Sequence, residues 1–282
     1  MKTKNSSGIA RSLLAHFVLI ILAFACLFFF YILIINSTAS HAELQKGFSA
    51  LPRGHFLENF KAVANDGTFP MLRGIVNSII VSSLNAAICT YFSALTAYGL
   101  YVYDFKLKKV AFTFIMVILV MPTQVTALGF LRLVTNMGLY DSLLPLIIPS
   151  IASPAVFYFM YSYLQSNLQI SLVEAARIDG CGEIKIFNRI IFPIMKPAVA
   201  VQAIFTFVGS WNNYFVPALI LQSKDKMTVP SLVATLRGAD YMNFDMGKVY
   251  MMITVAIVPI IIAYLFLSKY IIAGVALGGV KE

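Results

Sequence analysis

The sequence predicts an all-α integral membrane protein. Only 12% of its 282 residues are charged and 60% are hydrophobic, whereas about a quarter of the residues in a soluble domain are charged. The hydrophobic residues form runs long enough to cross a bilayer as helices. No Asp, Glu, Lys or Arg lies inside the six runs. The net charge of +9 therefore belongs to the loops, where no dense basic block suggests nucleic-acid binding.

Six transmembrane helices are expected, over residues 13–35, 75–100, 110–131, 143–164, 198–221 and 249–267. The first run continues ten residues beyond Ala25, too far for the hydrophobic region of a signal peptide, so we expect an uncleaved span. Pro122 interrupts the third run, and Pro259 is expected to kink the sixth. A short helix over residues 57–63 is expected in the first loop, along the membrane surface.

Six spans place both ends of the chain on one side of the membrane, and basic residues indicate which side. Residues 1–12, the short loop after the second span, residues 165–197 and the tail 268–282 together carry twelve basic and five acidic residues. The opposite side, mainly residues 36–74 and 222–248, carries nine basic and seven acidic residues. Because basic loops stay in the cytoplasm, we expect both termini and residues 165–197 to be cytoplasmic.

The segment 165–197 has the composition of a helical hairpin. Ser171 and Glu174 have the spacing of a capping box at the start of a helix. An Asp-Gly pair ending at Gly180 is expected to stop that helix. A second helix is expected to run until Pro193 stops it. A cytoplasmic hairpin held between two spans is suited to contacting something outside the membrane.

The polar residues inside the spans are all neutral. If the protein is a transporter, they indicate which class of solute it carries. Ion-coupled transporters usually need ionisable groups at depth, whereas amides and aromatic faces suit a neutral, hydroxyl-rich solute. The candidate pathway residues are Gln124, Trp211, Asn212, Asn213 and Tyr214. An interfacial anchor is the alternative role for Trp211, and helix–helix hydrogen bonding for the amides. We expect Asn77 and Asn85 to serve helix packing.

The chain has no phosphate-binding loop and no catalytic or metal-site pattern. Its only Gly-Lys pair, Gly247-Lys248, is followed by Val249 and does not complete a P-loop. The three histidines are scattered, and the three cysteines lack metal-ligand spacing. We therefore expect a non-enzymatic protein that binds no cofactor or metal and depends on a separate ATPase.

A specific spacing identifies a family. Glu174-Ala175-Ala176 is followed after three residues by Gly180, and after nine more by Ile190, one residue and Phe192-Pro193. This pattern resembles the EAA signature of permease subunits in bacterial ATP-binding-cassette (ABC) importers, with Phe192 in place of the usual Leu.

Further stretches extend the resemblance over nearly the whole chain, to the smaller permease of the carbohydrate-uptake, maltose-type subfamily. They are Met121 to Val125 with Gly138-Leu139, Trp211 to Tyr214 with Pro217, and the Gly-rich tail ending Val280-Lys281.

The resemblance implies a multi-pass subunit of the bacterial cytoplasmic (inner) membrane that works in a heteromeric complex. Its partners would be an ATPase dimer that binds ATP and Mg, a second related permease, and an extracytoplasmic solute-binding protein. The hairpin would dock on the ATPase through Glu174, Ala175, Ala176, Asp179, Gly180 and Pro193. Glu174 would meet a basic group there, the alanines would allow close approach, and Gly180 would make the turn. The tail would either reach the ATPase or be a frayed end.

The solute is expected to be a sugar or oligosaccharide, with a polyol, a glycerol-phosphate-type ester or an acidic oligosaccharide as the alternative. An anionic solute would favour Arg or Lys near the path, and the spans of this chain contain none. A second permease could supply them. The competing function is a stand-alone secondary transporter or channel, which would transport without nucleotide.

Overall fold

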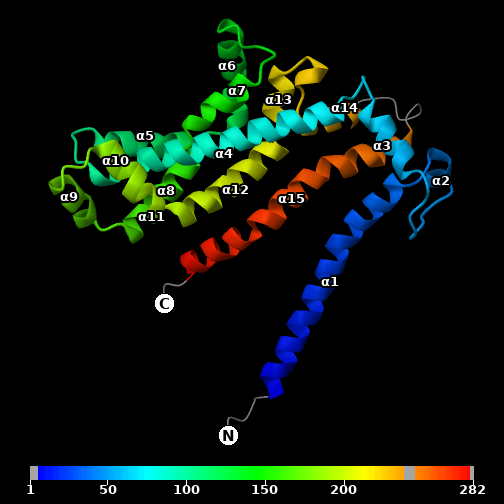
Figure 1. Cartoon of the computed structure of the whole chain (residues 1–282), viewed down its shortest axis with the longest axis horizontal. Helices are drawn as coiled ribbons and strands as arrows, with labels where there is room; N and C mark the ends of the chain where they lie inside the picture. The colour runs from blue at the N-terminus through cyan, green and yellow to red at the C-terminus, as the bar shows by residue number, and fades with distance from the viewer. Residues whose placement is uncertain (1–5, 238–244, 280–282) are drawn as a thin grey trace. The chain divides into compact units, whose positions relative to one another are not determined.

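The computed structural model describes residues 6–237 and 245–279, and all regular structure in these residues is helical. The chain divides into two units. Unit 1 consists of residues 1–69 and 239–258, and unit 2 of residues 70–238 and 259–282. Figure 1 labels the helices in chain order.

Unit 1 contains α1 (Ser6–Ser37), α2 (His41–Gln45), α3 (Phe56–Ala64) and the first part of α15 (Met246–Gly279). The helix expected over residues 57–63 is therefore confirmed as a helix. The buried Asn59 side chain donates hydrogen bonds to the carbonyls of Ser37 and Ala39, each at 2.9 Å. These bonds satisfy carbonyls at the end of α1, which would otherwise lack partners.

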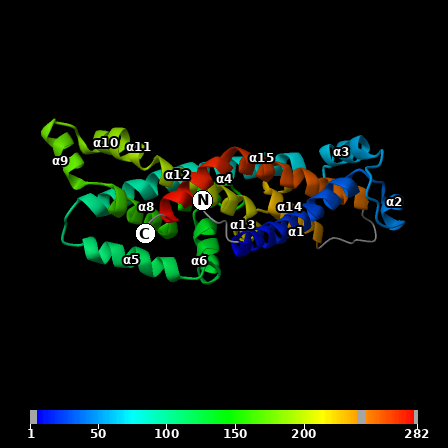
Figure 2. The ribbon, with the colours of Figure 1, turned by 90° about the horizontal axis from the view of Figure 1, so that it is seen from below.

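Unit 2 is organised around α4 (Met71–Val102), and α8 (Pro154–Asn167) and α12 (Lys196–Asn212) each pack against part of its length (Figures 1 and 2). Small residues on α4 permit this close packing, as between helices in membranes. Ala94 and Ala97 are fully buried. Both belong to a core that also includes residues of α8 and of the 165–197 segment.

The third expected span is sharply bent, and the fifth is interrupted. Residues 110–131 fall in α5 (Lys108–Val120) and α6 (Thr123–Asn136), which meet at 103° beside Pro122 (Figure 2). Proline removes a backbone donor and blocks the preceding turn, so a break at this site is expected. Residues 198–221 fall in α12 and α13 (Phe215–Ile220), with a break at Asn213.

Short elements complete unit 2. They are α7 (Leu144–Ile147), η1 (Ile148–Ile151), η3 (Lys224–Lys226) and α14 (Val229–Arg237). Within the described residues, four helices are long and apolar enough to cross a membrane, or up to six if each of two bent helix pairs counts as one span.

The helix that contains the sixth expected span, α15, is longer than the apolar run from which the span was predicted. It begins at Met246 and continues to Gly279, so the helix extends beyond the expected span 249–267 at both ends. No proline follows residue 267, and glycines lower helix propensity by only about 1 kcal/mol each. Lys281 lies outside the described residues.

Candidate functional site

The 165–197 segment forms the expected helical hairpin. Its first helix is α9 (Ile170–Ile178), and its second arm is α10 (Glu183–Ile186), a π-helical turn (Phe187–Ile191) and α11 (Phe192–Ile194). The second arm was expected to stop at Pro193, but it ends one residue later, at Ile194. Pro193 does not interrupt it because it lies in the first turn of α11, where proline is tolerated.

The expected capping box at Ser171 is wrong. Gln169 occupies the N-cap position of α9 and makes no side-chain capping bond. Ser171 therefore lies inside the first turn of the helix, where it cannot cap. Leu168 and Val173, on either side of the helix start, are buried in the core, so we infer that apolar packing outweighs the local capping preference.

Gly180 closes the hairpin turn with a Schellman motif. Its φ is +75°, a left-handed conformation that glycine adopts without steric penalty. The Gly180 amide donates to the Arg177 carbonyl and the Cys181 amide to the Ala176 carbonyl, each at 3.0 Å. The Asp-Gly pair thus stops the helix, as expected.

The inner face of the hairpin is part of the core of unit 2. Val173, Ala176, Ile186, Phe187 and Ile191 are buried, together with residues of α4 and α8. Ala176 is small because it packs inside its own subunit. The hairpin is therefore packed against the rest of unit 2 through this face.

The outer face is exposed and partly apolar. Glu174, Ala175, Asp179, Gly180 and Pro193 are all exposed. Beside them, Ile178 is 87% exposed and Ile184 is 77% exposed. These two isoleucines leave apolar surface on the hairpin that a partner could cover.

An ionic network joins the two arms of the hairpin to α4. Arg177 Nε lies 2.6 Å from Glu183 Oε1, and the Tyr98 hydroxyl donates to Glu183 Oε2 at 2.9 Å. The Arg177 guanidinium also lies over the Tyr103 ring, 5.3 Å from its centroid. These contacts lower the pKa of Glu183 to about 2, chiefly through the hydrogen bond from Arg177. Both charges are therefore present at any physiological pH.

Aromatic packing strengthens the same connection. Phe187 is buried and its ring contacts the rings of Tyr91 and Tyr98 of α4, each with centroids 5.6 Å apart. The Tyr91 hydroxyl donates to the Asn188 side chain at 3.1 Å. The second arm of the hairpin is therefore packed directly against α4.

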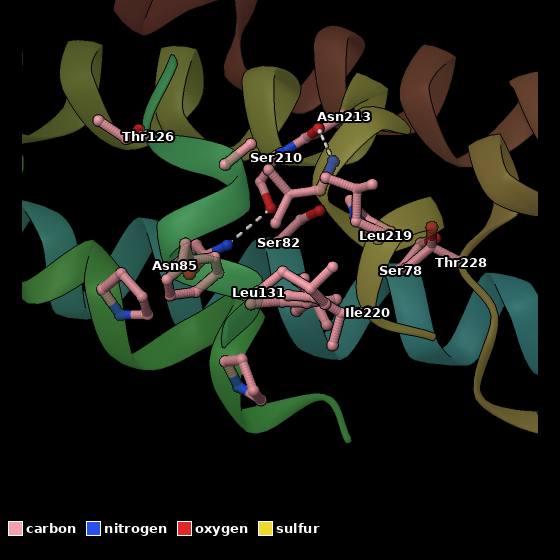
Figure 3. A pocket seen from close by; sticks show the side chains of 18 of the residues that line it. Ser78, Ser82, Asn85, Thr126, Leu131, Ser210, Asn213, Leu219, Ile220 and Thr228 are labelled. Atoms are coloured by element: carbon pink, nitrogen blue, oxygen red, sulfur yellow. Dashed lines mark hydrogen bonds between the residues drawn. The ribbon is translucent and has the colours of Figure 1, made fainter. Parts of the chain in front are cut away.

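Unit 2 also contains a cavity of about 460 Å³, shown in Figure 3. This size is within the range of small-molecule sites, about 300–1,000 Å³. Residues of α4, α6, α7, η1, α12 and α13 line it. Its polar residues are Ser78, Ser82, Asn85, Thr126, Ser210, Asn213 and Thr228, and none of its lining residues is ionisable.

Two side chains in the cavity wall carry buried polar atoms without a partner. Ser82 is fully buried and Asn85 is 9% exposed. Among the described residues, neither Ser82 Oγ nor Asn85 Oδ1 has a hydrogen-bond partner. An unsatisfied buried polar group destabilises a fold by about 1–3 kcal/mol, so such groups are usually retained for a reason.

The sequence-predicted pathway residues are placed differently from one another. Asn213 lines the cavity. Gln124, Asn212 and Tyr214 are exposed and are not part of its lining, and Trp211 is 2% exposed and stacked on Phe207.

Among the other polar residues of the cavity wall, Asn85 was named from the sequence, and as a packing residue. Asn77 donates to the carbonyls of Asp225 and Met227 and serves packing, as expected. Asn85 both packs, through a bond from its Nδ2 to Ser210 Oγ at 2.8 Å, and lines the cavity. Ser78, Ser82 and Asn85 follow an i, i+4, i+7 spacing, a polar stripe on one helix face that could have been detected.

No group of three or more His, Cys, Asp or Glu residues suited to a metal ion occurs in the part of the chain that the structure describes. Neither the hairpin nor the cavity brings together a nucleophile and a base. The hairpin offers an exposed face for contact, and the cavity offers a polar-lined space for a small molecule.

Comparison with known proteins agrees with this geometry. Residues 86–276 match the family described as binding-protein-dependent transport system inner membrane component. The chain is 34% identical, over the full length of both proteins, to the arabinooligosaccharides transport system permease protein AraQ of Halalkalibacterium halodurans. It is 31% identical to the melibiose/raffinose/stachyose import permease protein MelC of Bacillus subtilis, over 73% of this chain and 75% of that protein.

A solved structure shares the fold. It is a bacterial ABC transporter involved in the import of the acidic polysaccharide alginate, with a TM-score of 0.78, 22% identity, and coverage of 96% of this chain and 99% of that one. The resemblance found in the EAA spacing is confirmed. The chain belongs to the binding-protein-dependent transport system inner membrane component family and is a non-catalytic membrane permease subunit of an ABC importer.

Proposed function

We propose that this subunit forms part of the translocation pathway for a sugar or oligosaccharide, in a complex with a second related permease, an ATPase dimer and an extracytoplasmic binding protein. The observation that carries the proposal is the two-sided hairpin. Its inner face is locked to α4 through Phe187 and Glu183, while Ile178 and Ile184 are exposed at its outer face.

The proposed setting is the bacterial cytoplasmic membrane, crossed six times, with both termini in the cytoplasm. The excess of basic residues on the terminal side supports this orientation. It also puts the hairpin where an ATPase would be. Segments 36–74 and 222–248 would then face the binding protein.

The hairpin would transmit the movement of the ATPase as a rigid body. Glu174 would pair with a basic group of that subunit, and Ala175 would allow its surface to approach. Ala176 would support the contact from inside, since it is buried. Asp179 and Gly180 would shape the tip of the hairpin, and Pro193 its far end. ATP and Mg would bind to the ATPase and not to this chain.

The names of the relatives support a carbohydrate as cargo. They include permeases for arabinooligosaccharides and for melibiose, raffinose and stachyose. The uncharged cavity lining also favours a neutral solute. An acidic oligosaccharide is the second candidate, because the chain shares its fold with a subunit of an alginate importer.

The test is to reconstitute the complete importer with Glu174→Ala or Gly180→Pro and measure uptake and ATP hydrolysis together. Each variant is expected to insert normally, lose uptake and uncouple hydrolysis from transport. Gly180→Asn is the matched control, because Asn tolerates positive φ and should retain the turn and most of the uptake. Normal uptake with both Glu174→Ala and Gly180→Pro would exclude the proposed coupling role.

A further inference from the structure

The lining of the cavity of unit 2 contains both polar and apolar side chains. Ser82 and Asn85 of α4 and Ser210 of α12 supply hydroxyl and amide groups, and Figure 3 shows them beside one another. Apolar surface comes from Phe130 and Leu131 of α6, Pro145 and Leu146 of α7, and Pro149 of η1. A sugar has the same division, with hydroxyls at its edge and C–H groups on its faces.

The unpaired atoms are an independent sign of a ligand. Asn85 Nδ2 donates to Ser210 Oγ, which leaves Oδ1 without a partner. If the amide is assigned in the opposite orientation, Oδ1 accepts from Ser210 and the NH₂ group is left unpaired instead. One end of the amide therefore lacks a partner in either assignment, beside the unpaired hydroxyl of Ser82.

Ser82 can donate or accept, and the unpaired end of the Asn85 amide accepts or donates according to its orientation. A ligand that satisfies both groups in either orientation must therefore be able to donate and to accept hydrogen bonds. A hydroxyl does both, whereas a carboxylate only accepts. The lining contains no Lys, Arg or His to balance an anion, and no Asp or Glu to balance a cation. A charged ligand would therefore be desolvated without compensation. Water also has the required hydrogen-bonding character, so a water-filled cavity is the alternative that the experiment must exclude.

We propose that this cavity is a binding site, within this one subunit, for a neutral polyhydroxylated solute, and that Ser82, Asn85 and Ser210 are its polar contacts. The proposal rests on the importer function proposed above and adds the location and chemical class of a solute site. None of the three residues belongs to the hairpin.

Helix α4 connects the cavity to the hairpin, so binding of a solute could affect the contact with the ATPase. Asn85 lines the cavity, and Tyr98 on the same helix is hydrogen-bonded to Glu183 of the hairpin. Thirteen residues separate them, about 20 Å along a continuous helix. One rigid element thus forms both the cavity wall and the seat of the hairpin.

The experiment compares Ser82→Ala, Asn85→Leu and Ser210→Ala in the reconstituted importer, with Ser93→Ala as the matched control. Ser93 is also on α4, is 2% exposed and has an unpaired hydroxyl, but it does not line the cavity. The probes are labelled arabinotriose, raffinose and maltotriose, with trigalacturonate as the anionic comparison. Uptake kinetics and the melting temperature of the complex are measured for each variant.

Each cavity variant is expected to raise the KM for uptake of a neutral trisaccharide about 2- to 10-fold, as loss of one neutral hydrogen bond does. Ser93→Ala should leave the KM unchanged. Ser82→Ala should keep or raise the melting temperature, because it removes an unsatisfied buried group. A structural role would instead lower the melting temperature and leave the KM alone.

Two results would overturn the site. The first is a set of cavity variants that behave like Ser93→Ala while Glu174→Ala abolishes uptake, which would preserve the importer function and leave the cavity to water. The second is a wild-type importer that transports trigalacturonate alone or none of the neutral trisaccharides. Loss of uptake in the cavity variants with normal uptake in Glu174→Ala would count against the proposed coupling and not against the cavity.

Discussion

Arg177 and Glu183 form an ion pair across the turn of the hairpin, with Nε and Oε1 2.6 Å apart. The second carboxylate oxygen of Glu183 accepts from Tyr98 of α4. Glu183 therefore holds three elements together: both arms of the hairpin and the central helix. Both charged side chains are partly exposed, so the ion pair by itself contributes little to stability. Its importance lies in the three elements that it connects.

Replacing Glu183 with Ala is expected to reduce ATP-coupled uptake about two- to fivefold, because the hairpin arms lose their connection to α4. Arg177→Met should have a similar effect, and the double variant should be no worse than either single variant. The measurement is a double-mutant cycle on uptake by the reconstituted importer. Lys185→Ala, which removes an exposed charge from the same arm, is the control and should change uptake little. Additive losses would show that the two residues act separately.

The pH dependence of this network follows from the lowered pKa of Glu183. A depressed carboxyl pKa adds stability that is fully present above the ordinary value of 4.5, and that contribution is lost progressively as the pH falls from 4.5 through about 2. The ratio of wild-type to Glu183→Ala uptake should therefore stay constant between about pH 5.5 and pH 8. A ratio that changes across this interval would contradict a fully ionised pair.

Asp141 fastens the turn after α6 to the segment after α13. Its Oδ1 accepts from the amides of Gln222 and Ser223 at 2.9 and 3.0 Å, and its Oδ2 accepts from the Ser223 hydroxyl at 2.5 Å and from Lys226 at 3.2 Å. These bonds, the Ser223 hydroxyl first, hold the pKa of Asp141 well below its usual range. Asp141 also has a φ of +54°.

Three substitutions at Asp141 separate strain from hydrogen bonding. Asp141→Asn tolerates the left-handed backbone and should destabilise unit 2 by about 1 kcal/mol, through loss of the charged bonds. Asp141→Ala loses the bonds and adds strain, and should destabilise it by about 2–4 kcal/mol. Asp141→Gly should fall between them, because it relieves the strain. Thermal unfolding in detergent checks the order, and equal effects of Gly and Ala would show that strain contributes nothing.

Gly247 lies where unit 1 has no room for a side chain. A Cβ at this position would clash with the carbonyl oxygen of Ala39 and would lie 2.9 Å from Asn59 Nδ2. Gly247→Ala is therefore expected to destabilise unit 1 by about 1–3 kcal/mol, because backbone must shift and the Asn59 bonds must weaken. Thermal unfolding followed by circular dichroism measures the effect. Gly54→Ala is the control, since nothing lies within 4 Å of its Cβ position, and a loss of stability equal to that of Gly247→Ala would refute the steric explanation.

The membrane class, the hairpin and the dependence on a separate ATPase could all be predicted from local sequence. Long uncharged runs can be stable only in an apolar medium, and a helix must satisfy its own backbone groups there. The turn at Gly180 could also be predicted, because glycine adopts the left-handed conformation that ends a helix. The family followed from a spacing that begins at Glu174 and ends at Pro193.

The tertiary structure decided which side chains meet. Ser82 and Ser210 are far apart in the sequence yet share one cavity, and Ala176 faces inward although it adjoins the exposed Glu174 and Ala175. Ser171 failed as a cap because apolar packing set the start of α9. The sequence by itself therefore determined the membrane environment, the turn at Gly180 and the EAA spacing, because these depend on residues that are neighbours along the chain. Only the fold decided the cavity wall and the two faces of the hairpin, because burial depends on residues from distant helices.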